Sequence, residues 1–138
     1  MSHPTLLLAD DHRDTGNLLR ALLQDEFDVL AVVEDGIALV SAAELLSPDV
    51  IVTDISMPGL DGIAATTEIL HRNPIARIVL VTVSQDAAMV QRGLAAGALG
   101  YVVKRTAGEE LIPAVRSAVR GERHVSPPGP DAVTRSSS

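Results

Sequence analysis

Cysteine is absent from the 138-residue sequence. Its absence excludes disulfide bonds, thiol catalysis and thiolate metal sites, so a metal ion here would need oxygen ligands. Long apolar runs are missing as well. No stretch approaches the roughly 20 residues that span a bilayer, and the N-terminus lacks the basic segment and long apolar core of a signal peptide. These features predict a cytoplasmic protein that does not bind membranes.

Positive charge is also scarce. The chain has 11 basic against 18 acidic residues, a formal net charge of −7, and its one lysine is Lys104. Residues 104–138 carry six basic and four acidic side chains, so the acidity is concentrated in the residues before them. Because binding to a nucleic-acid phosphate backbone requires clustered Lys and Arg, we expect no direct nucleic-acid binding by this chain.

What the sequence does contain is a regular alternation of apolar runs and helical segments. Its length and its 46% hydrophobic content suit one domain with one core. The alternation is typical of a mostly parallel sheet flanked by helices, and continuous apolar runs suit strands buried on both faces. The predicted strands are 5–9, 29–33, 50–53, 76–82 and 101–103.

Helical spacing and helix-breaking residues complete this map. Leucines at 18, 19, 22 and 23 form one stripe, and apolar residues at 111, 112, 115, 118 and 119 form another. Ser47-Pro48 and Asn73-Pro74 each predict the end of a helix before a strand. Residues 123–138 are rich in Pro, Ser and Gly, which predicts a linker or disordered tail.

Acidic residues follow two of the predicted strands. Asp10 and Asp11 come directly after the first strand, and Asp54 comes directly after the third. Ligands of such sheets bind beyond the carboxyl ends of the strands, so the three carboxylates can converge. Taken singly, each Asp would more often cap a helix or begin a turn than serve a functional site. Together, carboxylates that stay ionised need a neutralising cation, and Mg²⁺ prefers such hard oxygen ligands.

Two further strand ends favour the functional interpretation. The fourth predicted strand ends on Thr82 and the fifth is followed by Lys104. A hydroxyl and an ammonium would then face the three carboxylates. This set could bind a metal, accept a phosphoryl group on a carboxylate and bind the new phosphate oxygens.

With these residues in place, the chain resembles the receiver domains of two-component response regulators, in particular those attached to LuxR- or NarL-type DNA-binding domains. The resemblance covers residues 4–122. It rests on four segments: Leu-Leu-Ala-Asp-Asp-His-Arg, Asp-Ile-Ser-Met-Pro-Gly-Leu-Asp-Gly, Val-Leu-Val-Thr-Val-Ser and Gly-Ala-Leu-Gly-Tyr-Val-Val-Lys. It implies a flavodoxin-like, doubly wound five-stranded parallel sheet, with helices on both faces and the strand order 2-1-3-4-5 for which the chemotaxis receiver CheY is a standard example.

The resemblance also implies roles for the acidic residues. Asp54 would be the phosphoacceptor. Asp10 and Asp11 would position Mg²⁺ together with Asp54, and Ser56 would offer its backbone carbonyl to the metal. His12 follows the acidic pair, but Mg²⁺ prefers oxygen ligands, so we expect His12 to be an ordinary surface histidine.

On the phosphate side, the resemblance implies that Lys104 pairs with the phosphoryl group and that Thr82 senses it. Tyr101 matches the aromatic position whose inward or outward state marks the switch, and we expect phosphorylation of Asp54 to bury its ring further. Arg105 stands where many receivers have a proline. We take this difference to be a subfamily feature.

The implied partner is a sensor histidine kinase, whose phosphohistidine donates the phosphoryl group. The domain would catalyse only its own phosphotransfer and dephosphorylation, and it would not be an enzyme otherwise. A homodimer could form on phosphorylation. The output would be transcription, through a LuxR-type helix-turn-helix domain that would lie beyond residue 138.

The sequence does not favour two other functions of similar α/β folds. An FMN carrier would need a Gly-, Ser- and Thr-rich loop after the first strand, where this chain has Asp10 and Asp11. A phosphatase of the haloacid dehalogenase type would need Asp-x-Asp after a strand, which neither acidic site supplies. A stand-alone receiver, or an interaction module that works without phosphorylation, remains open.

Overall fold

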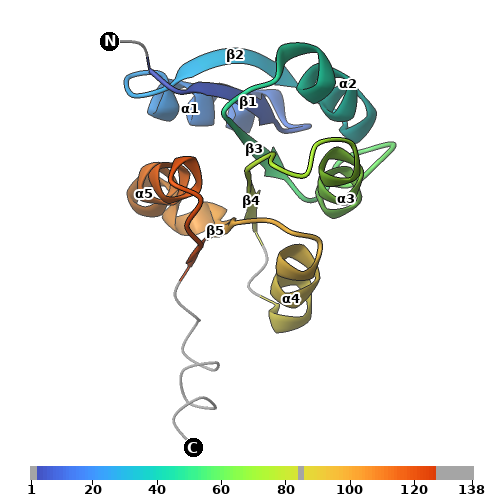
Figure 1. The fold of residues 1–138 in the computed structure, drawn as a ribbon. Helices are drawn as coiled ribbons and strands as arrows, with labels where there is room; N and C mark the ends of the chain where they lie inside the picture. The colour runs from blue at the N-terminus through green and yellow to red at the C-terminus, as the bar shows by residue number, and fades with distance from the viewer. Residues whose placement is uncertain (1–2, 84–85, 127–138) are drawn as a thin grey trace, which may run out of the picture.

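The computed structural model describes residues 3–83 and 86–126, which form a parallel six-stranded sheet between two layers of helices (Figure 1). The strand order is β2-β1-β3-β4-β5-β6, so the predicted order 2-1-3-4-5 is confirmed and a sixth strand is added at one edge. The strands are β1 (Thr5–Ala9), β2 (Asp28–Val33), β3 (Val50–Asp54), β4 (Ile78–Thr82), β5 (Gly100–Val103) and β6 (His124–Val125).

Helices cover both faces of the sheet, as predicted. They are α1 (Arg13–Leu23), α2 (Gly36–Leu46), α3 (Gly62–Arg72), α4 (Ala87–Ala95) and α5 (Ala107–Val119), with a short 3₁₀ turn, η1 (Lys104–Thr106), before the last. One apolar core lies under α1 and α5, and a second lies under α2, α3 and α4. Within the described part of the chain, no helix is both long enough and apolar enough to cross a membrane.

The burial of the strands explains their sequences. Every residue of β3 and β4 is buried, which matches their continuous apolar runs, whereas the edge strand β2 is only partly buried. The helical stripe on α1 is only partly as predicted. Leu19 and Leu23 are buried, but Leu18 is 71% exposed because it lies off the face that packs on the sheet.

Helix ends follow the local sequence. Asp35 and Asp61 accept hydrogen bonds from the backbone amides of Ala38 and Ala64, which fixes the starts of α2 and α3. Helix α2 ends at Ser47, whose φ of 45° lies in the left-handed region, and α3 ends at Asn73. Both Pro-containing stops predicted from the sequence therefore coincide with helix ends.

Strand β6 lies within the segment that the sequence predicted to be a linker, residues 123–138. Its pairing is parallel to β5, through hydrogen bonds from His124 N to Leu99 O (3.0 Å) and from Ser126 N to Tyr101 O (2.8 Å). The Ser126 hydroxyl accepts a further hydrogen bond from Val103 N at 3.0 Å. The first residues of this segment are thus part of the sheet, while residues 127–138 lie outside the described part.

Candidate functional site

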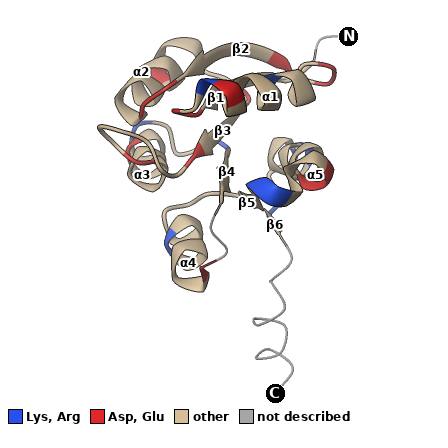
Figure 2. Ribbon diagram, turned by 180° about the vertical axis from the view of Figure 1, so that it is seen from behind, with Lys and Arg blue, Asp and Glu red and all other residues tan. Residues whose placement is uncertain are grey.

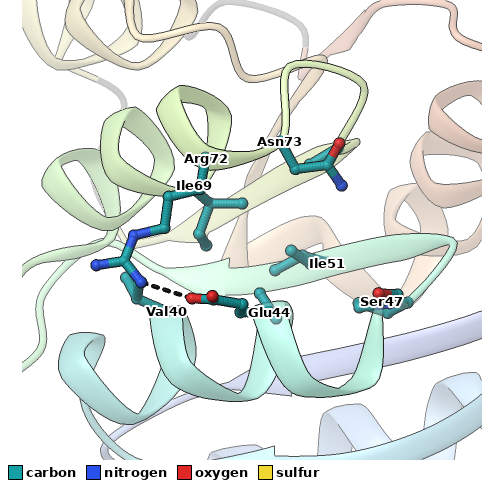
Figure 3. A pocket seen from close by; sticks show the side chains of 10 residues that line it. Val40, Glu44, Ser47, Ile51, Ile69, Arg72 and Asn73 are labelled. Atoms are coloured by element: carbon teal, nitrogen blue, oxygen red, sulfur yellow. Dashed lines mark hydrogen bonds and ion pairs between the residues drawn. The ribbon is translucent and has the colours of Figure 1, made fainter.

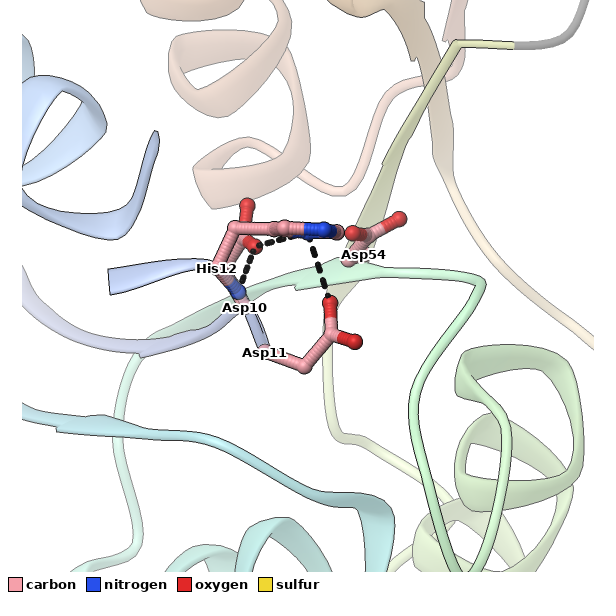
Figure 4. Close-up of side chains that lie close together, drawn as sticks. All are labelled: Asp10, Asp11, His12 and Asp54. Carbon is pink, nitrogen blue, oxygen red and sulfur yellow. Dashed lines mark hydrogen bonds and ion pairs between the residues drawn. The ribbon is translucent and has the colours of Figure 1, made fainter. Parts of the chain in front are cut away.

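The topology of the sheet brings Asp10 and Asp54 together. Strands β1 and β3 are neighbours, with Ala9 paired to Thr53, so the residues that follow lie level at the carboxyl ends of the two strands. The strand order reverses between these two strands, which is where ligands of doubly wound sheets bind. Figure 4 shows Asp10, Asp11, His12 and Asp54 gathered at this point, and Figure 2 shows red acidic ribbon at this end of the sheet.

Lys104 joins the two carboxylates. Its ammonium nitrogen lies 2.9 Å from Asp54 Oδ2 and 3.1 Å from Asp10 Oδ2. The side chain of Lys104 is 16% exposed, and those of Asp54 and Asp10 are 6% and 0% exposed. A charge pair this poorly exposed to water is weakly screened, so the single lysine of the chain is a strong local determinant of the charge here.

The carboxylate oxygens of the site differ in whether they accept hydrogen bonds. Asp10 Oδ1 accepts a hydrogen bond from His12 N at 2.8 Å, and Asp54 Oδ1 accepts one from Ser56 N at 3.3 Å. Asp10 Oδ2, despite its ion pair with Lys104, and Asp11 Oδ1 are buried without a hydrogen-bond partner within the described residues. Buried carboxylate oxygens lacking hydrogen bonds are costly, and a hard cation would satisfy them.

The donor set of this cluster therefore fits a metal ion. One ligand atom from each of Asp10, Asp11, His12 and Asp54 can be chosen so that all lie within 4.8 Å of one another. Three of the four are carboxylates, the ligand type that Mg²⁺ prefers. The Ser56 amide is held at Asp54, and the role of its carbonyl as a ligand stays a prediction.

Burial and charge shift two pKa values at the site. Burial raises the pKa of Asp54, and the Asp10 charge adds to this, against the lowering effect of the Lys104 hydrogen bond and charge. For Lys104, burial acts to lower the pKa, but the hydrogen bond to Asp54 and the charges of Asp54 and Asp10 outweigh it, so the pKa is raised. The lysine is thus held in its charged form beside a carboxylate that burial has made less acidic.

Thr82 occupies the expected place on the adjoining strand. It ends β4, is 4% exposed, and pairs with Val103, the residue before Lys104. On its other side β4 pairs Val81 with Asp54. Thr82, whose hydroxyl is predicted to sense phosphate, therefore ends the strand that lies between β3, which carries Asp54, and β5, which Lys104 follows.

Tyr101 is buried in the second core, with 1% of its surface exposed. Burial, with a smaller contribution from the charge of Asp86, raises the pKa of its phenol to about 12. A Cβ on Gly93 of α4 would lie 3.6 Å from the ring, so the helix packs directly over it. The ring is thus in the inward state in this structure, and the expectation that phosphorylation buries it further stays a prediction.

Comparison with known families matches residues 6–116 to the response regulator receiver domain. The chain belongs to this family. The receiver is 33% identical over 124 residues to the response regulator GacA of Pseudomonas aeruginosa, covering 88% of this chain and 58% of that protein. It is 34% identical over 125 residues to the oxygen regulatory protein NreC of Staphylococcus carnosus, again covering 88% and 58%.

Among solved structures, the receiver superposes on a LuxR-family two-component response regulator from Aurantimonas sp. SI85-9A1 with a TM-score of 0.88. The sequence identity is 31%, and the match covers 96% of this chain and 94% of that one. The receiver is therefore of the kind found in LuxR- and NarL-type two-component regulators. It spans just over half the length of the two curated relatives.

A separate pocket of about 230 Å³ lies between α2 and α3 (Figure 3). Ile51, near the start of β3, lies in its wall, whereas Asp54 ends the same strand. An ion pair of 2.6 Å joins Arg72 to Glu44 at the pocket. None of the residues lining this pocket belongs to the acidic cluster, so we assign it no part in the chemistry of the receiver site.

Proposed function

We propose that this receiver accepts a phosphoryl group on Asp54 from the phosphohistidine of a sensor kinase and passes the signal to a transcriptional output in a longer protein. The observation that carries the proposal is the arrangement of Asp54. It is a buried carboxylate with a lysine ammonium 2.9 Å away and two further carboxylates beside it. A purely structural aspartate has no need for this set of neighbours.

The transfer requires a carboxylate oxygen of Asp54 to attack phosphorus. The new O–P bond forms as the N–P bond to the donor histidine breaks, and the imidazole nitrogen leaves with the electron pair. Lys104 is positioned to neutralise negative charge on the phosphoryl oxygens, and the rigid strand end fixes the direction of attack. The reaction thus depends on positioning and charge, which this site supplies.

The acidic side of the site would hold Mg²⁺ through Asp10, Asp11, Asp54 and the backbone carbonyl of Ser56. When bound, the metal would supply positive charge to the phosphoryl oxygens. Asp10 is fully buried and tied to the His12 amide. Its carboxylate is therefore held in one orientation.

The switch would run from Thr82 to Tyr101. Both are buried and lie on adjacent strands, with Leu80 of β4 paired to Tyr101 of β5. A phosphoryl group on Asp54 would attract the Thr82 hydroxyl and alter the packing around the aromatic ring. Dimerisation of the receiver would be one means of passing this change to the output.

Intact mass spectrometry tests the proposal. Acetyl phosphate with Mg²⁺ should add one phosphoryl group to the wild type and none to Asp54→Ala. Asp49→Ala, which changes an aspartate at the opposite end of β3, should be phosphorylated like the wild type. Phosphate retained by Asp54→Ala would refute the assignment. An unmodified wild type that also fails to respond to beryllofluoride would favour the phosphorylation-independent interaction module.

A further inference from the structure

The imidazole of His12 belongs to the acidic cluster. Its Nδ1 lies 3.0 Å from Asp11 Oδ1 and 3.7 Å from Asp10 Oδ1. Figure 4 shows the ring beside the carboxylates, with dashed lines from its nitrogen to Asp10 and Asp11. The expectation that His12 is an ordinary surface histidine therefore holds for its 70% exposure but not for the direction of its ring.

The contact between His12 and Asp11 is not a hydrogen bond. Asp11 Oδ1 is buried and has no hydrogen-bond partner in the described part of the chain, although Nδ1 is only 3.0 Å away. The two atoms are close but not aimed at each other. Ligands held about 2.1 Å from one cation, at the angles of octahedral or tetrahedral coordination, lie roughly 3.0–3.4 Å apart. The observed spacing suits two atoms that share a cation.

The backbone explains why the ring is available. His12 precedes α1 as its N-cap residue, in an extended conformation (φ −99°, ψ 112°), and its side chain makes no capping hydrogen bond. Its backbone amide is tied to Asp10 Oδ1 at 2.8 Å. The main chain is thus fixed against the buried Asp10, while the imidazole is left to face the cluster.

We infer that His12, through Nδ1, is a further metal ligand of this site and makes it bind divalent cations that accept imidazole, such as Zn²⁺, as well as Mg²⁺. The inference rests on the proposed function, because it concerns the same metal site. Imidazole suits Zn²⁺ and similar ions, whereas Mg²⁺ prefers oxygen. His12 therefore raises the affinity of the site for Zn²⁺ and similar ions. Mg²⁺ is bound through the three carboxylates and does not use the imidazole.

Calorimetric titration of the 138-residue protein with MgCl₂ and with ZnCl₂ separates the two classes. His12→Ala should weaken Zn²⁺ binding by about tenfold or more, in line with the loss of a ligand or its support, and should leave Mg²⁺ binding within about twofold. His71→Ala, which removes an exposed histidine from α3, should change neither. Nitrogen-15 NMR of the imidazoles should show the Nδ1 signal of His12 shifting with Zn²⁺ and not with Mg²⁺.

The outcomes distinguish this inference from the proposed function. If His12→Ala binds Zn²⁺ as tightly as the wild type, or if the Nδ1 signal of His12 does not respond to Zn²⁺, the inference is wrong while the Mg²⁺ site stands. Equal losses of Mg²⁺ and Zn²⁺ affinity would also overturn it, because His12 would then support the site without selecting the ion. A wild type that binds no Mg²⁺ would instead count against the proposed function.

Discussion

The ammonium nitrogen of Lys104 lies within 3.1 Å of Oδ2 of Asp10 while it also contacts Asp54 at 2.9 Å. The lysine is therefore a counter-ion that joins Asp54, the proposed nucleophile, to Asp10 on the acidic side of the site. Without it, two buried carboxylates would repel each other across a medium that screens poorly. Asp11 and His12, which lie against each other in the same cluster, remain available to bind a metal ion.

Lys104→Ala should bind Mg²⁺ more tightly than the wild type, by about tenfold or about 1.4 kcal/mol, because a competing positive charge is removed. The same variant should lose its conformational response to beryllofluoride. Calorimetry and NMR chemical shifts measure the two effects. Arg105→Ala, which removes the next and exposed cation, is the matched control and should retain the response. A collapse of Mg²⁺ affinity in a folded Lys104→Ala would disprove this division of roles.

The raised pKa of Asp54 predicts a pH-dependent cost in stability. The folded state holds this proton more firmly than the unfolded state, so the contribution of Asp54 to stability is present below about pH 4 and is lost as the pH rises through the folded pKa. Asp54→Asn removes the ionisable carboxyl group, and with it this loss of stability at higher pH. Its free energy of unfolding in urea should exceed that of the wild type by a margin that grows from pH 4 to pH 7.

The control for this stability effect is Asp25→Asn, which removes an exposed carboxylate from the turn after α1. It should show no comparable gain between the same two pH values. A wild type more stable than Asp54→Asn at pH 7 would mean that the ion pair with Lys104 outweighs the burial of Asp54.

Gly62 is predicted to be required for the shape of the loop after Asp54. A Cβ at this position would lie 2.1 Å from the backbone oxygen of Asp54, and the Gly62 amide donates to Ile55 O at 2.7 Å. Gly62→Ala should cost about 1–3 kcal/mol of stability and slow phosphorylation, because the strand end must move. Gly108→Ala, where a Cβ meets no atom within 4 Å, should be neutral or stabilising by up to about 1 kcal/mol. Similar losses in both variants would refute the steric explanation.

The phenol of Tyr101 should titrate with a pKa of about 12, which absorbance of this single tyrosine can follow. Asp86→Asn should lower that pKa, because the Asp86 charge opposes formation of the phenolate. Asn is also a good N-cap, so α4 should keep its start. Acrylamide should quench the tyrosine emission weakly when beryllofluoride and Mg²⁺ are present, because the ring is then buried as it is in this structure. An ordinary tyrosine pKa would show that the ring is exposed in solution.

Local sequence predicted most of the fold because the strands are continuous apolar runs. The limits of β1 were predicted to the residue, and β3 differs only by including Asp54. For β4 the prediction began two residues early, at Ala76, since periodicity cannot show where pairing starts. Strand β6 was missed for a different reason. Two residues, His124 and Val125, carry no pattern of their own and become a strand only by pairing with β5.

The candidate site was predictable as a set of residues but not as a geometry. Asp10, Asp11, Asp54 and Lys104 stand at strand ends, and parallel strands bring such ends to one edge. The sequence could not reveal that Lys104 would contact Asp10 as well as Asp54, or that the ring of His12 would face Asp11. Both depend on side-chain directions. The buried state of Tyr101 likewise depends on how α4 packs, which periodicity does not determine.

Because of strand β6, one backbone amide, that of Val103, can be used to monitor the edge of the sheet. The amide of Val103 donates its hydrogen bond to the Ser126 hydroxyl, and Ser126 is anchored in turn to Tyr101 O. Val103 is the last residue of β5, two residues after the buried Tyr101 and directly before Lys104. Deuterium exchange at that amide therefore measures how often β6 leaves the sheet. A rearrangement at the lysine or the aromatic ring would change that exchange rate, so the opening of the sheet edge can be followed in the unlabelled protein.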